Sequence, residues 1–539
     1  MWPRWSLQVT DADFYDLDTS QPIVIEVTLS PVPEQLAVDG VYGQYLRGWK
    51  DGGLLEEPED GVEPAITIRL EIGEEVQPEW TVVVDRETLE PAPIGAKRRA
   101  MFGVVRLGGW HVRDLTWARG SAFARAADTD DTGTVLTEAH RTARDSVKVD
   151  VDGLAEVLAK IGGGAAAFGV GEDAIRELQV ILDPTVTGFG AGALVLANSK
   201  VPLRQAGLGT SRLAALAVQV LASGDAGIVL VDEVEHGLEP HRIIGLTHEL
   251  RRRLDIGEGE KRGGRVFMTT HAPVAVCEIG GDGVHVVRRD DGVVTVQPAG
   301  TDLTDLVRGY PDALLARRVV VCEGRTEMGI CRGLEQVRWK GDDGEGALSH
   351  RGIALADGRG NDQAPKTAVR LAGLGYDVLL FADSDVPLGV QVGELEEAGV
   401  TVVQWDGEVA TEERCADDLP RDGLVRMVEY TVETFGLGSV RDTLNHRLGD
   451  DGPLEGDAPG AWIDQIGENV FRRVFGATAK ESDRNDRTAR GSKPKGWFKT
   501  IDAGEYLGAI IAEAWEGLEG TDLRAKLSQI EEWVYEDGG

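Results

Sequence analysis

The order of apolar and polar positions divides the chain into regions with different predicted structure. In roughly the first hundred residues, short apolar runs are separated by turns rich in Pro, Gly and Asp, at 22–29, 65–70 and 80–84. Runs of this kind predict β-strands. From about 122 to 182 the spacing of apolar residues becomes helical, and it predicts a helical insertion.

Later apolar runs have the length and the β-branched content of buried strands. These runs are 228–231, 265–268, 319–322 and 378–382. Valine-rich stretches at 283–287 and 293–296 predict a hairpin, and 302–316 predicts a short helical linker. Strands that alternate with helices predict an α/β fold.

Acidic residues follow the third and fourth of these runs. Glu323 comes directly after the third run, Gly324 permits a sharp turn, and Glu327 falls in the first turn of the following helix. Asp383 and Asp385 follow the fourth run and, two apart on an extended segment, project to the same side. Open α/β sheets place their sites at the carboxyl ends of strands, and converging carboxylates are what Mg²⁺ requires. Acids that are merely solvated would explain each residue singly, but the ordered set favours a metal site.

A second set of motifs lies upstream and is typical of nucleotide hydrolysis. Gly207 and Gly209 form a glycine-rich turn before an apolar helix, where backbone amides attract phosphate. Asp232 and Glu233 follow the apolar run 228–231, as in a Walker B motif. In such a motif Asp232 would hold Mg²⁺ through water, and Glu233 would activate the attacking water. The strand from 265 ends in His271, which is suited to lie beside a γ-phosphate. An ordinary strand with terminal acids and a core histidine would explain each piece but not the order.

The two sets of motifs resemble two known families. The glycine-rich turn, the Walker B strand, the Leu-Glu-Pro loop at 238–240 and the strand ending in His271 resemble the ABC-type ATPases of the DNA-repair and chromosome-maintenance group. The strand, Glu-Gly, second Glu and Asp-x-Asp of 319–385 resemble the TOPRIM fold of topoisomerases, bacterial primases and certain nucleases. Their combination resembles the overcoming-lysogenisation-defect (OLD) family of ATP-dependent nucleases, which includes the nuclease subunit of Gabija anti-phage systems.

The resemblance implies an α/β protein in three parts. They are an ABC-type ATPase domain over 1–300 with the helical insertion, a TOPRIM core over 316–410, and a mainly helical C-terminal region over 411–539 that completes the nuclease site. The family also has a Gly-x-x-x-x-Gly-Lys-Ser/Thr loop that wraps phosphates, and the sequence contains no match to it. We therefore expect an ATPase domain without its first strand, loop and first helix, and no ATP-specific binding by this chain alone. A misplaced or trimmed start is favoured by the downstream order; a loop from another polypeptide and decay to a scaffold are the alternatives.

For the nuclease site, the resemblance makes Glu323 a metal ligand or base and makes Glu327, Asp383 and Asp385 further ligands. Two metal ions would activate water and stabilise the leaving oxygen. Acids past the TOPRIM core could contribute to the second metal, and Asp418 is favoured among the candidates Glu412, Glu413, Asp417 and Asp418.

The family also uses a late lysine near the scissile phosphate. Positions 480–499 hold seven Lys/Arg against three acids, so this stretch is basic although the chain as a whole is acidic. Within this stretch Lys495 best fits the family's pattern of a lysine followed by aromatic residues. It is the first choice for the lysine near the scissile phosphate, and Lys499 is the second choice. A solvated basic loop is the alternative interpretation.

Composition limits the setting of this chemistry. The chain has 539 residues and a net charge of −36, which repels phosphate at long range, so DNA binding needs a locally basic surface and bound cations. The acidity could equally reflect the proteome of the source organism. No apolar run approaches the roughly 18 residues of a membrane span, and the amino terminus lacks a signal-peptide core. Four scattered cysteines offer neither a disulfide framework nor zinc spacing, so we expect a cytoplasmic protein.

The sequence therefore predicts a DNA nuclease that depends on Mg²⁺ or Mn²⁺ and is regulated by an ABC-type ATPase module that uses ATP in the full-length protein, in phage defence or DNA processing and repair. The expected partners are DNA, further copies of the chain, and a helicase-like or other defence-system protein. Further copies are expected because, in the family, the glycine-rich turn acts on ATP bound by a partner protomer. The main alternative is an ATP-gated DNA-binding clamp or regulator with a non-cleaving TOPRIM domain. A primase or topoisomerase fits less well, because zinc-ribbon cysteines are missing.

Overall fold

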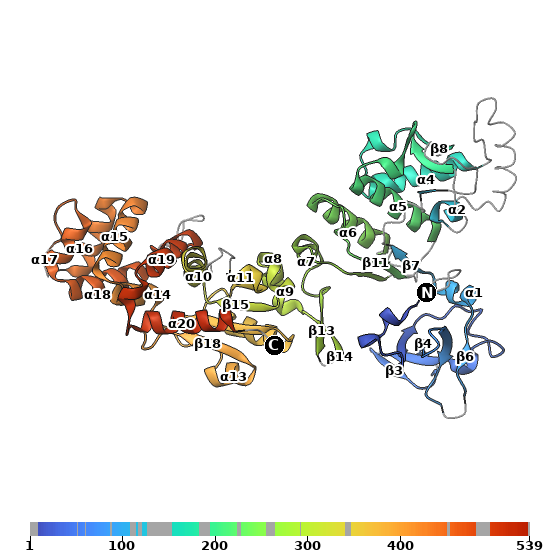
Figure 1. Cartoon of the computed structure of the whole chain (residues 1–539), viewed down its shortest axis with the longest axis horizontal. Helices are drawn as coiled ribbons and strands as arrows, with labels where there is room; N and C mark the ends of the chain where they lie inside the picture. Colours follow the sequence, from blue (N-terminus) through green and yellow to red (C-terminus); the bar gives the residue numbers. More distant parts are fainter. Residues whose placement is uncertain are drawn as a thin grey trace. The chain divides into compact units, whose positions relative to one another are not determined.

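The computed structural model describes residues 9–50, 52–59, 61–86, 89–107, 115–116, 121–126, 153–182, 194–223, 228–254, 265–290, 293–339, 347–449, 453–480 and 496–536. The chain forms two compact units, Met1–Ala275 and Val276–Gly539. Figure 1 labels the elements of each unit. Within the described ranges, no helix is both long and apolar enough to cross a lipid bilayer.

A six-stranded antiparallel sheet opens the first unit and is built around β4 (Glu63–Ile72). β4 pairs with β1 (Ile23–Leu29) and with β5 (Pro78–Val83), and these three are the strands predicted near the start of the chain. Ile66 and Ile68 of β4 are buried in the core of this sheet. The other strands are β2 (Arg47–Lys50), β3 (Gly53–Leu55) and β6 (Ala92–Pro93), and the short helix α1 (Ala96–Arg99) follows.

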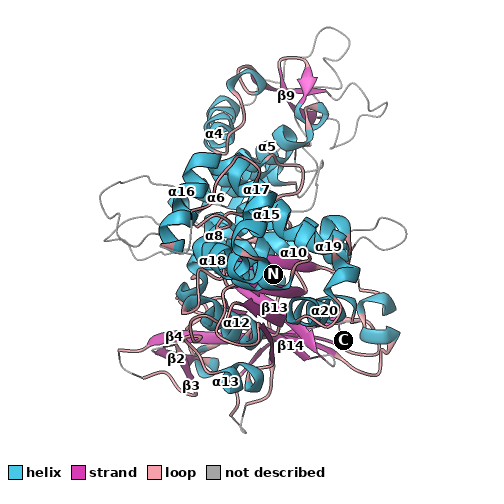
Figure 2. Cartoon of the chain, turned by 90° about the vertical axis from the view of Figure 1, so that its left-hand side faces the viewer, coloured by secondary structure: helices cyan, strands magenta, loops and turns pink. Residues whose placement is uncertain are grey.

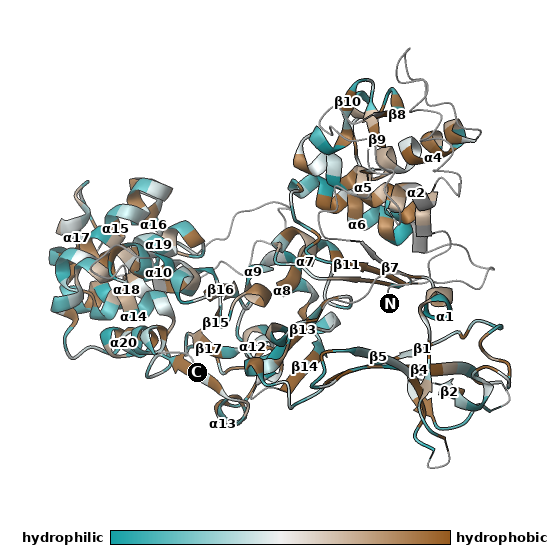
Figure 3. Ribbon diagram, turned by 45° about the vertical axis from the view of Figure 1, so that its right-hand side comes forward, coloured by the Kyte–Doolittle hydropathy of each residue, from teal (hydrophilic) through white to brown (hydrophobic). Residues whose placement is uncertain are grey.

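A parallel sheet carries the Walker B sequence. β11 (Ile228–Val231) lies between β7 (Val104–Leu107) and β12 (Arg265–Met268). Val229 and Val231 are buried in a core that β11 shares with α5 (Leu208–Ser223) and α6 (Pro240–Leu254). Figure 3 colours β11 and β7 as hydrophobic strands. The apolar run thus forms a central strand whose carboxyl end carries Asp232.

The region predicted as a helical insertion is only partly helical. Its described helices are α2 (Ala122–Ala126) and α4 (Leu154–Ala167). It then continues into an antiparallel sheet, β10-β9-β8, with β8 (Leu178–Leu182), β9 (Leu194–Asn198) and β10 (Val201–Pro202). Positions 127–152 of the predicted insertion lie outside the described residues.

The second unit is organised around a four-stranded parallel sheet in the order β16-β15-β17-β18. Its strands are β15 (Arg318–Cys322), β16 (Ile353–Asp357), β17 (Asp377–Ala382) and β18 (Val400–Gln404). Val319 and Val321 of β15 face one hydrophobic core, whereas Val320 and Cys322 face another. Because parallel sheets are buried on both faces, their strands read as continuous apolar runs.

One valine of the predicted hairpin, Val286, joins the core that contains Val319, whereas Val287, Val293, Val294 and Val296 are exposed. Val286 and Ala299 are buried here, and the hairpin lies in the second unit. The boundary between the units falls at 275/276, whereas the sequence prediction ends its first domain at 300. The elements on this side are α7 (Pro273–Ile279) from Val276 onward, β13 (His285–Asp290), β14 (Val293–Pro298), α8 (Thr304–Gly309), α9 (Asp312–Leu315), α12 (Gln363–Gly373) and α13 (Val392–Glu397).

Helices make up the other side of the sheet and the described part of 411–539, as Figure 2 shows in cyan. They are α10 (Arg325–Val337), α11 (Ala347–His350), α14 (Thr411–Asp418), α15 (Arg421–Phe435), α16 (Leu437–Leu448), α17 (Pro459–Ile466), α18 (Glu468–Lys480), α19 (Ile501–Glu513) and α20 (Asp522–Tyr535).

Candidate active site

The ends of two neighbouring strands place Glu323 and Asp383 together. β15 and β17 are adjacent and parallel, so both residues leave the sheet at the same edge. The backbone N–H of Glu323 donates to the Phe381 carbonyl oxygen at 2.8 Å, and the N–H of Asp383 donates to Glu323 Oε2 at 3.2 Å. Asp383 is only 8% exposed. The sheet itself therefore brings the predicted pair into contact.

Glu327 joins this edge from the first turn of α10. Its Oε2 accepts a hydrogen bond from the Gly324 N–H at 3.0 Å, and its side chain is buried. Gly324 has φ −149° and ψ −167°. This is extended backbone that other residues adopt, so the predicted need for glycine at the turn does not come from backbone conformation.

Burial and mutual repulsion raise the pKa of all three carboxyl groups. Burial and the neighbouring Glu327 raise the pKa of Glu323 to about 7. Burial and the neighbouring Glu323 raise the pKa of Asp383 to about 10, while burial and Glu412 raise the pKa of Glu327. Within the described residues, the buried Asp383 Oδ1 accepts no hydrogen bond. The carboxyl groups at this edge of the sheet therefore lack the nearby positive charge that would favour their ionised forms.

Lys499 and the buried Glu412 form a half-buried ion pair beside Glu327. Lys499 Nζ lies 2.7 Å from Oε1 of Glu412, a residue with no exposed surface. Thr326 Oγ1 donates to the Phe498 carbonyl oxygen at 2.9 Å, which fixes the backbone next to this lysine. The second-choice lysine of the sequence prediction thus lies at the carboxylates. Lys495, the first choice, lies outside the described residues.

Glu413, one of the acids that the sequence left open for a second metal, meets Asp385 through Lys480, a residue to which the sequence assigned no role. Lys480 Nζ lies 3.2 Å from Asp385 Oδ2 and 2.9 Å from Glu413 Oε2. The signal available in the sequence was the pair of glutamates at the start of α14, but the residues alone did not rank this pair above Asp418.

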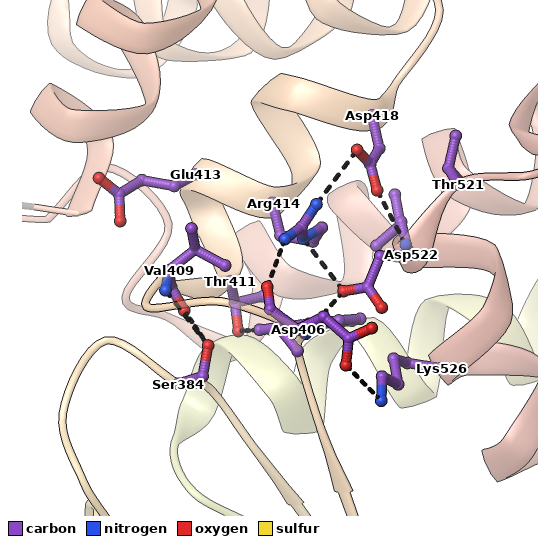
Figure 4. A network of polar contacts seen from close by, with 12 residues as sticks. Ser384, Asp406, Val409, Thr411, Glu413, Arg414, Asp418, Thr521, Asp522 and Lys526 are labelled. Carbon is purple, nitrogen blue, oxygen red and sulfur yellow. Dashed lines mark hydrogen bonds and ion pairs between the residues drawn. The ribbon is translucent and has the colours of Figure 1, made fainter.

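Asp418, which the sequence favoured as a ligand of the second metal, has Arg414 and α20 as its partners in the structure. Its Oδ1 is 3.4 Å from Arg414 Nη1, and its Oδ2 accepts the Leu523 N–H at 2.8 Å. Figure 4 shows Glu413 and Asp418 projecting from different sides of α14. Asp418 therefore links α14 to α20, together with an ion pair between Arg414 and Asp522 at 3.3 Å.

A close helix crossing holds α19, and with it Lys499, against the site. Glycines of α10 and α19 face each other: a Cβ added at Gly329 would lie 2.5 Å from the Gly504 Cα, and one at Gly333 would lie 2.8 Å from the Gly508 Cα. Figures 1 and 2 both show the two helices side by side. Only glycine permits this approach of the two backbones.

The donor set fits a divalent cation chemically, although its side chains are not arranged as a finished coordination shell. Carboxylate oxygens are the ligands that Mg²⁺ and Mn²⁺ prefer, and the orphaned Asp383 Oδ1 marks a place where positive charge is missing. No three His, Cys, Asp or Glu side chains among the residues described could hold one ion together. Glu323 and Asp383, with Glu327 and Asp385 beside them, are the candidate ligands.

In the first unit, Thr269 joins the two Walker B acids. Its Oγ1 donates to Asp232 Oδ1 at 2.7 Å and accepts the Glu233 N–H at 2.8 Å. Glu233 has a left-handed φ of 45°, a strained conformation for this residue, and its side chain is 61% exposed. His271 follows β12 at the same edge of the sheet, and its backbone N–H donates to Glu235 Oε1 at 2.7 Å. Neither Thr269 nor Glu235 was identified from the sequence.

The sequence placed both Gly207 and Gly209 in a turn before the helix, but α5 already begins at Leu208, so Gly209 lies within the helix. A Cβ at Gly209 would lie 2.9 Å from the Gly237 carbonyl oxygen, so this glycine serves packing against the loop after Walker B. Gly207 precedes the helix and has no atom within 4 Å of a Cβ position. Arg212 Nη2 donates to the Glu233 carbonyl oxygen at 2.7 Å and ties α5 to the Walker B loop.

Comparisons with known proteins assign an ATPase-type domain to this region. The family model described as "AAA domain, putative AbiEii toxin, Type IV TA system" matches residues 197–276, which include Asp232, Glu233 and His271. Among curated proteins, no match was found.

Three solved structures align with parts of the chain. The Smc head bound to the C-terminal winged-helix domain of ScpA aligns at 12% identity over 43% of this chain and 67% of that chain (TM-score 0.25). The Smc head with an extended coiled coil, bound to the C-terminal domain of ScpA derived from Pyrococcus furiosus, aligns at 12% over 43% and 71% (TM-score 0.27). The C-terminal region of the Xanthomonas campestris pv. campestris OLD protein aligns at 17% over 37% and 97% (TM-score 0.18). TM-scores this low carry no further argument.

Proposed function

We propose that this chain is a metal-dependent DNA nuclease of the OLD type, with a TOPRIM-type site in the second unit and an ATPase-type domain that regulates it. The observation that carries the proposal is the meeting of Glu323, Glu327 and Asp383 at one sheet edge, where burial raises the pKa of each. Concentrating like charges in a half-buried place destabilises a fold unless a cation compensates them. A fold used for binding alone has no need of such an arrangement.

The residues of this edge have properties that suit phosphodiester hydrolysis. A bound Mg²⁺ or Mn²⁺ would supply an activated water and polarise a phosphate oxygen. Glu323 and Asp383, which meet at the carboxyl ends of β15 and β17, would be the principal ligands of that ion. Lys499, held by Glu412, would offset the charge that develops on the scissile phosphate.

The ATPase-type segment supports a regulatory role for nucleotide. Asp232, Glu233 and His271 lie in the part of the chain that matches an AAA domain, whereas the acids proposed for cleavage lie in the other unit. A nuclease under nucleotide control fits phage defence or DNA processing. The competing function, an ATP-gated clamp that binds DNA without cutting it, is favoured by one observation: the described acids do not form a three-ligand set as they stand.

Incubation of the purified chain with supercoiled plasmid separates these functions. The nuclease proposal predicts nicked or linear products with Mg²⁺ or Mn²⁺ and none with EDTA, and DNA retention on a filter reports binding in parallel. Plasmid that is retained in every condition and stays intact with both cations would support the clamp and contradict the nuclease.

A further inference from the structure

Two lysines divide the acids at this edge of the sheet into sets. The acids are Glu323, Glu327, Asp383, Asp385, Glu412 and Glu413. Lys499 lies 2.7 Å from Glu412, and its pKa is raised by the charges of Glu412 and Glu327, which outweigh the effect of burial. Lys480 lies 3.2 Å from Asp385 and 2.9 Å from Glu413. Each ammonium therefore neutralises part of the cluster.

Lys480 is held in this position by packing as well as by charge. It is the last residue of α18, and α18 lies so close to α14 that a Cβ at Gly476 would be 3.0 Å from the Glu413 Cα. Glu413 is fixed in turn, because its Oε2 also accepts the Ala410 N–H at 3.0 Å. The side chains of Lys480, Asp385 and Glu413 are 31%, 19% and 21% exposed, so the contact is half-buried.

The remaining pair is Glu323 and Asp383. Within the described residues, no Lys or Arg forms an ion pair with either of them, and the Asp383 N–H donates to Glu323 Oε2 at 3.2 Å. In the part of the chain that the structure describes, the site thus offers one uncompensated pair of carboxylates and one pair, Asp385 and Glu413, that already has its cation. An ammonium within 3.2 Å of both acids of a pair leaves no room for a divalent ion between them.

We propose that Lys480 takes the place of a second divalent cation, so that the site binds one such ion per chain, through Glu323 and Asp383. The inference rests on the proposed nuclease function and replaces the two-metal expectation of the sequence analysis. Lys480 acts as a positioning residue: it neutralises Asp385 and Glu413 permanently, and it holds α14 and the loop after β17 in one arrangement. Removing its charge leaves two adjacent carboxylates that attract a second ion.

Titration of the full chain with Mn²⁺, followed by the electron paramagnetic resonance of free Mn²⁺, counts the bound ions. All variants carry Asp232→Asn, which removes the candidate ion of the Walker B site. Ions of the nuclease site are those lost in Asp383→Asn. The expected count is one for the chain with Lys480, one for Lys480→Arg, and two for Lys480→Ala. Lys366→Ala is the matched control, because Lys366 makes a comparable ion pair with Asp362 at 2.9 Å on α12 and should leave the count at one.

Two results would overturn the role of Lys480 and leave the nuclease site intact. One is a count of two site ions in the chain that retains Lys480. The other is a count of one ion in a folded Lys480→Ala or Lys480→Met chain. Mn²⁺ binding that is unchanged in Asp383→Asn would instead overturn the proposed site. The count with Lys480 present needs no folded variant of this residue, so the inference is tested even if Lys480→Ala fails to fold. Circular dichroism of each variant establishes which chains are folded.

Discussion

At the scale of single residues, Asp383 is a carboxyl that burial and neighbouring charges keep protonated. Its carboxyl faces Glu323, Glu327 and Asp385, and its pKa is raised to about 10 by burial and by these charges. A carboxyl whose folded pKa lies above its unfolded value of about 4 stabilises the fold at low pH, and this contribution is lost as the pH rises toward the folded pKa. Asp383→Asn mimics the protonated form. In EDTA at pH 8 it should therefore raise the free energy of unfolding by about 1–3 kcal/mol, measured by urea denaturation.

The same measurement at lower pH is the control for this prediction. At pH 5, which lies only about one unit above the unfolded pKa, much less free energy is needed to protonate Asp383 on folding than at pH 8, so the difference between the chain and Asp383→Asn should shrink. An Asn variant that is less stable than the original chain at both pH values would contradict the electrostatic explanation.

Lys499 and Glu412 should separate stability from catalysis. Lys499→Met leaves the fully buried Glu412 without its partner and should destabilise the fold by roughly 3 kcal/mol. Adding Glu412→Gln removes the stranded charge and should restore the melting temperature. It should not restore cleavage, because the ammonium near the phosphate is still missing. Recovery of cleavage in the double variant would give Lys499 a purely structural role.

The residues that sequence reasoning identified best are those fixed by local geometry. Glu323 and Asp383 follow buried parallel strands, so their meeting at one edge could be predicted before any packing was known. Glu413 and Asp418 lie on one short helix, and the choice between them depends on which face of α14 turns to the sheet. That face is set by α18 and α20, which are distant in sequence, so the residues of α14 alone could not decide it.

At the scale of elements, the crossing of α10 and α19 should control the position of Lys499. Gly329→Ala places a Cβ against the Gly504 Cα and should push the helices apart. We expect a lower melting temperature and a loss of cleavage larger than the loss of DNA binding. Gly393→Ala in α13, where a Cβ meets no atom within 4 Å, is the matched control and should change neither. Equal behaviour of the two variants would contradict the role of the crossing.

Strands were predicted more reliably than the assignment of elements to units. The runs that became β4, β11, β15 and β17 are apolar enough to reveal buried strands locally. The hairpin β13–β14 was also predicted, but not its unit, because valines that alternate along a strand do not indicate which core they join. The helical pattern from 122 to 182 likewise did not reveal that β8 begins at Leu178, since only pairing with β9 makes that segment a strand.

At the scale of the whole molecule, a net charge of −36 makes local cations decisive for DNA binding. Arg325 and Arg359 are 59% and 50% exposed beside the carboxylate edge, and Arg359 has a strained φ of 63°. Arg325→Ala with Arg359→Ala should weaken DNA binding and lower the slope of log affinity against log salt by about 2, close to one for each phosphate that an arginine no longer neutralises. Arg421→Ala, which removes an arginine 42% exposed on α15, is the control and should leave the slope unchanged. An unchanged slope in the double variant would place the DNA elsewhere.

The most direct test of a carboxylate nuclease site is the single-turnover cleavage rate of the chain, Asp383→Asn and Asp418→Asn, with saturating Mn²⁺ and a linear DNA. Removing one group that stabilises the transition state commonly lowers a rate by roughly 10²–10³. We predict a decrease of at least that order for Asp383→Asn and a rate within about threefold of the original for Asp418→Asn, whose side chain binds α20 instead of the site. Cleavage by Asp383→Asn at the original rate would contradict the account.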